Sequence, residues 1–228
     1  MNWKFHIILS VALIVLASCK SAPKATLSPI ETKLCDSLGF DLDIVLQVKS
    51  EAHATTPVLD FVHEKKGEFL DDRTEGPLHA GLLLNVDTNL VDLVVEKLRD
   101  GLRHKGYTLF VLDHNFGINN QPDQLALVKD TSLTNILHLV GTGGYNYDID
   151  TDSLIVLLDG LRKQYPWKIK GIGFDWCEFD VIDKTTNWNQ LAQTVFTIAP
   201  DVVTQGTETV PALASELQKS HSIYFWWD

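Results

Sequence analysis

The chain has 228 residues, of which 45% are hydrophobic and 21% are charged, and its formal net charge at pH 7 is −11. This composition is typical of a globular protein with enough apolar residues for one well-buried domain. The acidic balance argues against nucleic acid as a partner and against a basic membrane-surface helix, because both need a positively charged face.

The first 18 residues have the layout of a secretory signal peptide. Lys4 precedes an apolar run that only Ser10 interrupts, and small residues follow the run. The run is short for a membrane-spanning helix. We therefore expect a signal peptide over residues 1–18, with an uncleaved N-terminal helix as the alternative.

Residues 16–19, Leu-Ala-Ser-Cys, resemble the lipobox of bacterial lipoproteins at all four positions. The resemblance implies that Cys19 carries lipid and anchors the protein in a bilayer. In such lipoproteins, an Asp directly after the lipidated Cys resembles a signal for retention in the inner membrane. This chain has Lys20 at that position, which favours the outer membrane and a domain that faces the periplasm. Residues 19–29 are rich in Pro, Ser and Ala and predict a tether of at most about 30 Å.

Two cysteines remain for the folded part, Cys35 and Cys177. A disulfide between them is compatible with the oxidising cell envelope. No close spacing supports a disulfide framework, so two buried free thiols are the favoured interpretation. The sequence leaves both open.

The first half of the predicted domain alternates apolar runs with an amphipathic segment. We expect a helix at residues 29–40 and strands at residues 43–48, 58–62, 81–86 and 107–113. A further helix is expected between Asp87 and Gly106, where apolar residues recur at helical spacing. Asp87 is a typical N-cap residue, and Gly106 suits the end of a helix.

The second half continues this alternation. We expect, in chain order, a strand at 124–128, a helix from 132 to a glycine near 141, a helix from 151 or 152, a long strand at 168–182, a helix at 187–199, a helix from 207 or 209, and a strand at 222–228. The long strand has candidate bends at Gly171 and Gly173. In the last strand, residues 223, 225 and 227 share one face.

Together these elements predict a single α/β or α+β domain over residues 30–228. Several strands are apolar on both faces, so we expect a layered mixed β-sheet covered by helices. Residues 222–228 are apolar on both faces until Asp228, which predicts that the C-terminal strand lies inside the sheet.

No signature of a cofactor or metal site is complete. Residues 141–144, Gly-Thr-Gly-Gly, lack the spacing of a dinucleotide loop or a P-loop. Asp148, Asp150 and Asp152 begin a pattern like a calcium loop, but Ser153 stands where that loop needs glycine. A helix N-cap is the favoured interpretation. We therefore expect no cofactor and no metal.

Three short motifs resemble the bacterial domain of unknown function family 4253. They are residues 146–148 (Asn-Tyr-Asp), residues 200–206 (Pro-Asp-Val-Val-Thr-Gln-Gly) and residues 226–228 (Trp-Trp-Asp). The resemblance covers about residues 106–228 and departs from the family at Ala199, where a Cys is common. It implies a fold and candidate residues but no reaction.

The candidate functional face follows from these polar, turn-rich motifs, because loops on a rigid scaffold often carry function. Its residues are Asn146, Tyr147, Asp148, Asp201, Gln205, Trp226 and Asp228. We expect the segments around Tyr147 and Asp201 to lie side by side. Trp226 with Tyr224 is a candidate ligand platform.

Two functions remain open from the sequence. The favoured one is a membrane-anchored periplasmic module that binds a protein or a small molecule, including an immunity-like inhibitory role. The alternative is a hydrolase that uses Asp148 and Asp201, with or without a metal, since paired carboxylates can divide acid and base roles. Convergence of Asp148, Asp201 and Asp228 in one pocket would favour the hydrolase.

Overall fold

The fold is organised by one mixed β-sheet, seen in a computed structural model that describes residues 25–61, 81–116, 118–183 and 186–228. Within these residues seven strands form the sheet in the order β1-β2-β4-β3-β5-β6-β7. The strands are β1 (Leu59–Asp60), β2 (Gly81–Val86), β3 (Thr108–Asp113), β4 (Asp123–Val128), β5 (Trp167–Ile172), β6 (Trp176–Val181) and β7 (Ser222–Trp226). Strands β3 and β5 are parallel and the other neighbours are antiparallel. The predicted α/β class is confirmed.

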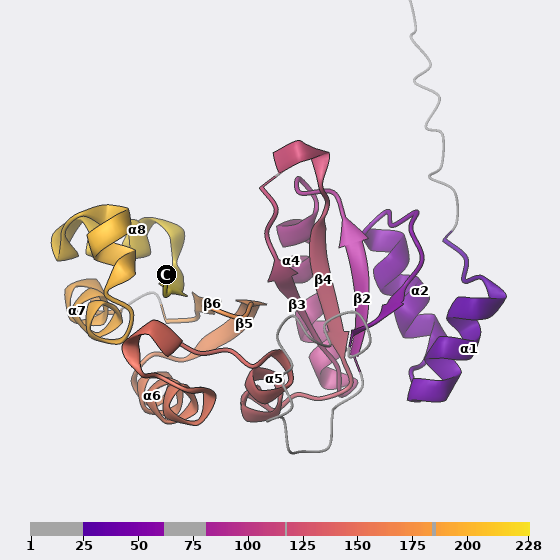
Figure 1. Cartoon of the computed structure of the whole chain (residues 1–228), viewed down its shortest axis with the longest axis horizontal. Helices are drawn as coiled ribbons and strands as arrows, with labels where there is room; N and C mark the ends of the chain where they lie inside the picture. The colour runs from indigo at the N-terminus through magenta and orange to yellow at the C-terminus, as the bar shows by residue number, and fades with distance from the viewer. Residues whose placement is uncertain (1–24, 62–80, 117, 184–185) are drawn as a thin grey trace, which may run out of the picture.

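Helices cover both faces of this sheet. They are α1 (Pro29–Leu38), α2 (Leu42–Glu51), α4 (Val91–His104), α5 (Leu133–Val140), α6 (Thr151–Gln164), α7 (Trp188–Ile198) and α8 (Val210–Ser220), with short 3-10 helices η1 (Ile118–Asn120) and η2 (Tyr145–Tyr147) and a π-helix η3 (Val202–Thr207). Figure 1 shows α1 and α2 on one side of the central strands and α5 to α8 on the other. One hydrophobic cluster joins α1, α2 and α4 to β2, β3 and β4, and a second joins α5 to α8 to the opposite sheet face.

Helix α4 follows the predicted apolar spacing, but it begins at Val91 with Leu90 as the N-cap, and Asp87 is not its cap. Its buried residues are Val91, Val94, Val95, Leu98 and Leu102. Arg103 and His104 lie in its last turn, where cations are favourable against the helix dipole. Replacing one buried leucine by alanine typically costs about 2–5 kcal/mol. The helix therefore contributes to stability mainly through this stripe.

The prediction of a strand at residues 43–48 is wrong, because this segment lies within α2. The Asp41 side chain accepts a hydrogen bond from the Asp43 N–H at 2.9 Å and caps the helix. Ile44, Val45 and Val48 are buried at helical spacing. A short apolar run fits either element, and here the cap and the burial of one face favour the helix.

The prediction of one long strand at residues 168–182 is also wrong, because β5 and β6 form an antiparallel hairpin. The Gly173 N–H donates to the Trp176 carbonyl at 2.9 Å and closes the turn. The Trp176 ring covers both glycines: a Cβ on Gly171 or Gly173 would lie within 2.5 Å of it. The glycines are needed for this close approach. Gly173 lies in the turn, whereas Gly171 lies within β5 next to a shift in the strand register.

Strand β7 forms in the predicted segment, but it lies at the edge of the sheet and pairs with β6 alone among the described strands. The prediction that it lies inside the sheet is therefore wrong. The predicted alternation is present: Ile223, Phe225 and Trp227 are buried, whereas Tyr224 is exposed. One face of the strand therefore belongs to the core, and on the other face Tyr224 is exposed and Trp226 is half-buried.

The two cysteines are free thiols buried in different clusters. Cys35 lies in the cluster of α1, α2 and α4, and Cys177 lies in the cluster of α5 to α8. The sheet therefore separates them. Of the two alternatives left by the sequence, the free thiols are confirmed.

The predicted leader and Cys19 lie outside the described residues. Where the chain is described, no helix has both the length and the apolar character needed to cross a membrane. The first described helix, α1, begins with a capping box in which Ser28 and Glu31 bond to each other's backbone N–H groups. The first described helix therefore starts at Pro29.

Candidate functional site

The segments around Tyr147 and Asp201 are in contact, as the sequence predicts. The Tyr147 hydroxyl donates to Asp201 Oδ1 at 2.6 Å. The Asp228 N–H donates to Asp201 Oδ2 at 3.0 Å, and the Thr204 hydroxyl lies 3.3 Å from Oδ1. One carboxylate therefore ties η2, η3 and Asp228 together.

The Asp201 carboxylate is buried, with 3% of the residue exposed. Burial by itself raises the pKa of this carboxyl, but hydrogen bonds from Tyr147, from the Asp228 N–H and from Gln205 and Thr204 outweigh burial and lower the pKa. The same contact raises the pKa of the Tyr147 phenol. Asp201 is thus held in its ionised form, and both carboxylate oxygens accept hydrogen bonds from within the protein. This is typical of a carboxylate with a structural role.

Two of the predicted residues lie apart from this contact. Asn146 and Asp148 are exposed, and among the described residues their side chains make no hydrogen bond. Asp148 has a φ of 57° and ends η2, so its position is a turn position. Asp150 accepts from the Ser153 N–H at 2.8 Å and caps α6, as predicted for a helix cap.

Trp226 belongs to a different surface, a pocket that runs along β7, which we call the β7 pocket. Its volume is about 520 Å³, within the range of ligand sites. It is lined by Glu178, Val202, Gly206, Thr207, Leu213, Glu216, Leu217, Ser220, Ser222, Tyr224 and Trp226. The lining therefore combines aromatic and aliphatic side chains with two carboxylates and no Lys or Arg.

One wall of the β7 pocket is the π-helix η3, which the sequence did not predict. This helix starts after Asp201 and ends before Glu208, whose φ is 65°. π-Helices occur frequently at functional sites. Gly206 faces open space: a Cβ added there would meet nothing closer than the Asp201 carbonyl oxygen at 3.9 Å. A side chain larger than hydrogen can therefore be introduced at position 206 without a steric clash at its Cβ atom.

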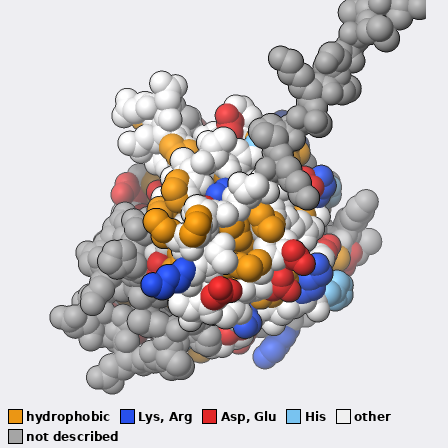
Figure 2. Space-filling model, turned by 90° about the vertical axis from the view of Figure 1, so that its right-hand side faces the viewer, with side chains coloured by type: hydrophobic (Ala, Val, Ile, Leu, Met, Phe, Trp, Pro, Cys, Tyr) orange, Lys and Arg blue, Asp and Glu red, His pale blue; other side chains and the backbone are white. Residues whose placement is uncertain are grey.

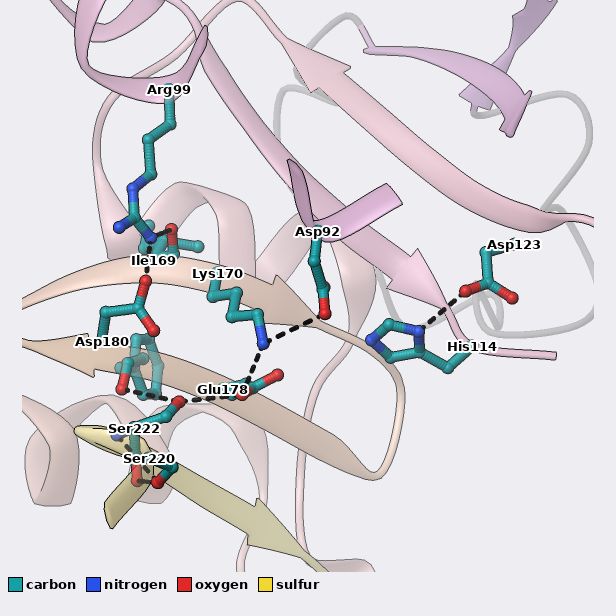
Figure 3. Close-up of polar contacts among 11 residues, drawn as sticks. Asp92, Arg99, His114, Asp123, Ile169, Lys170, Glu178, Asp180, Ser220 and Ser222 are labelled. Atoms are coloured by element: carbon teal, nitrogen blue, oxygen red, sulfur yellow. Dashed lines mark hydrogen bonds and ion pairs between the residues drawn. The ribbon is translucent and has the colours of Figure 1, made fainter. Parts of the chain in front are cut away.

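Glu178 links the pocket to the sheet surface. It accepts hydrogen bonds from the Ser222 hydroxyl at 2.8 Å and from Lys170 at 3.0 Å, and Lys170 also lies 3.4 Å from Asp92 (Figure 3). Burial by itself lowers the pKa of Lys170, but the carboxylates of Glu178, Asp92 and Asp180 outweigh burial and raise the pKa. The ammonium group therefore stays charged and holds Glu178 in place.

Tyr224 is the second aromatic side chain of the pocket and stacks on Trp176 with ring centroids 5.8 Å apart. Burial raises the pKa of its phenol to about 12, and the carboxylates of Glu178 and Asp175 add to the shift. Tyr224 therefore remains a neutral hydroxyl at ordinary pH. Its ring offers an apolar contact beside a polar donor.

The sequence missed a polar pair, His114 and Asp123. His114 Nδ1 lies 2.9 Å from Asp123 Oδ2 (Figure 3). The His114 ring also packs against Trp176, with ring centroids 5.4 Å apart. Asp123 is fully buried and also accepts from Thr88 and from the Asn115 N–H. Position 123 starts β4 and position 114 follows β3, so only strand pairing brings them together.

Within the described part of the chain, no three His, Cys, Asp or Glu side chains are grouped so that they could hold a metal ion. Burial raises the pKa of Asp175, a backbone hydrogen bond opposes this, and the nearby carboxylates of Asp228 and Asp113 add to the increase. Mutual repulsion of this kind needs no bound ligand to explain it.

Sequence reasoning therefore identified part of each surface. It placed on one face residues that the structure divides between two surfaces: Asp201, Tyr147, Gln205 and Asp228 at the first, and Trp226, with Tyr224 as its platform partner, at the second. It missed Glu178 and Glu216, which carry the charge of the β7 pocket. The only signal for Glu178 was its position two residues from Trp176 in an alternating strand.

Comparison with known proteins gives a match to one family model, described as Domain of unknown function (DUF4253), over residues 124–228. The comparisons with curated proteins and with solved structures gave no match. The matched region starts at the second residue of β4 and contains Tyr147, Asp201 and the whole β7 pocket. Residues 124–228, the part of the chain that carries both surfaces, are therefore similar to the DUF4253 family model.

Proposed function

We propose that this protein is a binding module of the bacterial cell envelope, and that its partner binds in the β7 pocket. The observation that carries the proposal is the pocket itself, a space of about 520 Å³ lined by Tyr224, Trp226 and two carboxylates beside an edge strand. Aromatic walls supply contact area, and a few placed polar groups supply orientation. No reaction is needed to account for these residues.

The proposed location is a membrane, through a lipid on Cys19. The tether would hold α1 within about 30 Å of the bilayer. Figure 2 shows the side of the molecule that carries α1 and α2, where hydrophobic side chains gather among charged ones. Ile30 in α1 is 82% exposed. A membrane-facing orientation of this side is compatible with the proposed anchor.

The hydrolase alternative receives no support from the geometry of its carboxylates. Asp201 is buried and both its oxygens accept hydrogen bonds. A general acid needs a raised pKa, and the pKa of Asp201 is lowered. Asp148 lies outside the β7 pocket.

The location is tested by fractionating cells that express the wild type or Cys19→Ala. We expect the wild type in the membrane fraction with added mass at the new N-terminus, and the variant without that mass. A wild-type protein that is unmodified and found in the soluble fraction would contradict the anchor.

The binding surface is tested in intact cells with a photo-cross-linking amino acid at Glu216, in the pocket lining, or at Asp159, on the exposed side of α6. We expect a specific adduct from position 216 alone. Gly206→Leu, which fills the pocket, should abolish the adduct, whereas Gly160→Leu should not. Both glycines are exposed and have room for a side chain. Equal adducts from both positions, or an adduct insensitive to Gly206→Leu, would contradict the proposal.

A further inference from the structure

The outer edge of β7 has backbone groups that point away from the sheet. In the antiparallel pair with β6, Trp227 N donates to the Asp175 carbonyl and Val181 N donates to the His221 carbonyl. Hydrogen-bonded pairs alternate along such a ladder, so residues 221, 223, 225 and 227 bond to β6. Residues 222, 224, 226 and 228 therefore direct their N–H and C=O groups outward.

Both ends of this outward row are already satisfied. The Ser222 N–H and C=O groups lie 3.2 and 3.4 Å from the Ser220 hydroxyl. The Asp228 N–H bonds to Asp201 at 3.0 Å. Between them, the N–H and C=O groups of Tyr224 and Trp226 have no partner among the described residues. The unpaired part of the edge is thus limited to the two residues whose side chains line the β7 pocket.

We propose that an extended, basic segment of a partner protein binds in the β7 pocket as an additional strand, paired with Tyr224 and Trp226. This rests on the proposed function and names the class of partner. Groups two residues apart repeat at about 6.8 Å along a strand, a spacing that another β-strand matches. Strand addition of this kind takes its affinity from main-chain bonds and its specificity from alternate side chains.

The charge of the pocket favours a basic segment over a second copy of this chain. Its charged lining residues are Glu178 and Glu216. Lys170 already engages Glu178, whereas Glu216 is exposed and forms no ion pair among the described residues. A symmetric β7–β7 contact would place the acidic pockets of two chains of net charge −11 against each other. A Lys or Arg side chain from a partner strand would instead meet carboxylates.

The test uses the full chain in detergent micelles and synthetic hexapeptides as probes. The first peptide alternates Lys and Val, the second has the same sequence with N-methylated backbone nitrogens on one edge, and the third alternates Glu and Val. We expect the first to slow amide hydrogen exchange at Tyr224 and Trp226 about tenfold or more, as backbone pairing does. N-methylation should weaken binding by about tenfold or more, and the acidic peptide should not bind.

Variants of the protein complete the test. Tyr224→Pro removes an outward N–H while leaving the ladder to β6, and Tyr224→Thr keeps that N–H but removes the ring. We expect the Pro variant to bind more weakly than the Thr variant, and Gly206→Leu to bind more weakly than Gly160→Leu. If Tyr224→Pro does not fold, the N-methylated peptide tests the same hydrogen bonds.

Two results would overturn the inference: equal binding of the first two peptides, or no binding of the first. If position 216 still cross-links in a Gly206-dependent way in cells, the proposed function stands and only the strand addition fails. If the cross-link also fails, both fail.

Discussion

We predict that the ionised Asp201 carboxylate stabilises the C-terminal part of the domain through its hydrogen bonds. The substitution Asp201→Asn keeps the size of the side chain and removes its charge. Its two oxygens accept hydrogen bonds from the Tyr147 hydroxyl at 2.6 Å and from the Asp228 N–H at 3.0 Å. Both are bonds to an ionised acceptor in a residue that is 3% exposed.

The magnitude follows from those two bonds. A hydrogen bond to a charged group contributes about 1.5–3 kcal/mol, whereas a neutral one contributes about 0.5–1.5 kcal/mol. Losing the charge thus costs about 1 kcal/mol per bond, or about 2 kcal/mol in total. Because the folded-state pKa of Asp201 is lowered, its contribution is present above the usual aspartate pKa and is lost as the pH falls below it.

The assay is urea unfolding of the purified protein at pH 7 and at acidic pH, with Asp148→Asn as the control. Asp148 is exposed, with a φ of 57°, a conformation that Asn adopts readily. We expect Asp148→Asn to leave the free energy of unfolding unchanged and Asp201→Asn to lower it, by an amount that shrinks as the pH falls. Equal stability of Asp201→Asn and wild type at pH 7 would refute the structural role and reopen a functional one.

Three further predictions concern other parts of the fold. Trp227 is 2% exposed and donates to the Ile198 carbonyl at 2.9 Å, so Trp227→Ala should lower the free energy of unfolding by about 3–5 kcal/mol, and a chain ending at Ile223 should lack a cooperative urea transition. Burial raises the pKa of Glu31, but hydrogen bonds from Lys49 and from backbone N–H groups outweigh burial and lower the pKa to about 2. The stability that the Glu31 carboxylate provides should therefore be lost as the pH falls from 4.5 towards 2. Glu31→Gln should not show this loss in urea unfolding, and a pH profile identical to that of the wild type would contradict the assignment. Burial raises the pKa of Cys177 well above 9, so its thiol should resist alkylation in the native protein and react in denaturant, and rapid native labelling would show that it is accessible.

The strongest parts of the fold prediction were segments with one clear period. Helix α4 has apolar residues at helical spacing, from Val91 to Leu102, with a helix stop at Gly106, and the structure confirms the helix. Strands β2 and β4 were equally clear as short buried runs. The strand prediction for residues 43–48 is wrong because a short segment rich in apolar residues fits either a strand or part of a half-buried helix.

The candidate site was predicted in part, for a physical reason. Tyr147 and Asp201 lie in polar, turn-rich motifs of a chain whose other segments have regular apolar spacing, and for this reason the sequence predicts that they are functional and adjacent. The hydrogen bond of 2.6 Å between their side chains confirms that the two segments are in contact. Sequence alone assigned them to a functional face, whereas burial and hydrogen bonding make Asp201 an internal acceptor. Glu216 looked like any exposed helical carboxylate until α8 was placed beside β7.

The sequence by itself determined the α/β class, the main helices and strands, and which residues of the last strand face the core, because these depend on local periodicity. Only the tertiary structure decided that β7 is an edge strand, that residues 168–182 turn back as a hairpin, and that Cys35 and Cys177 lie on opposite faces of the sheet. These depend on strand order, which is set by contacts between residues far apart in the chain. The β7 pocket is of this second kind, because β6, β7, η3 and α8 form it only after the sheet is assembled.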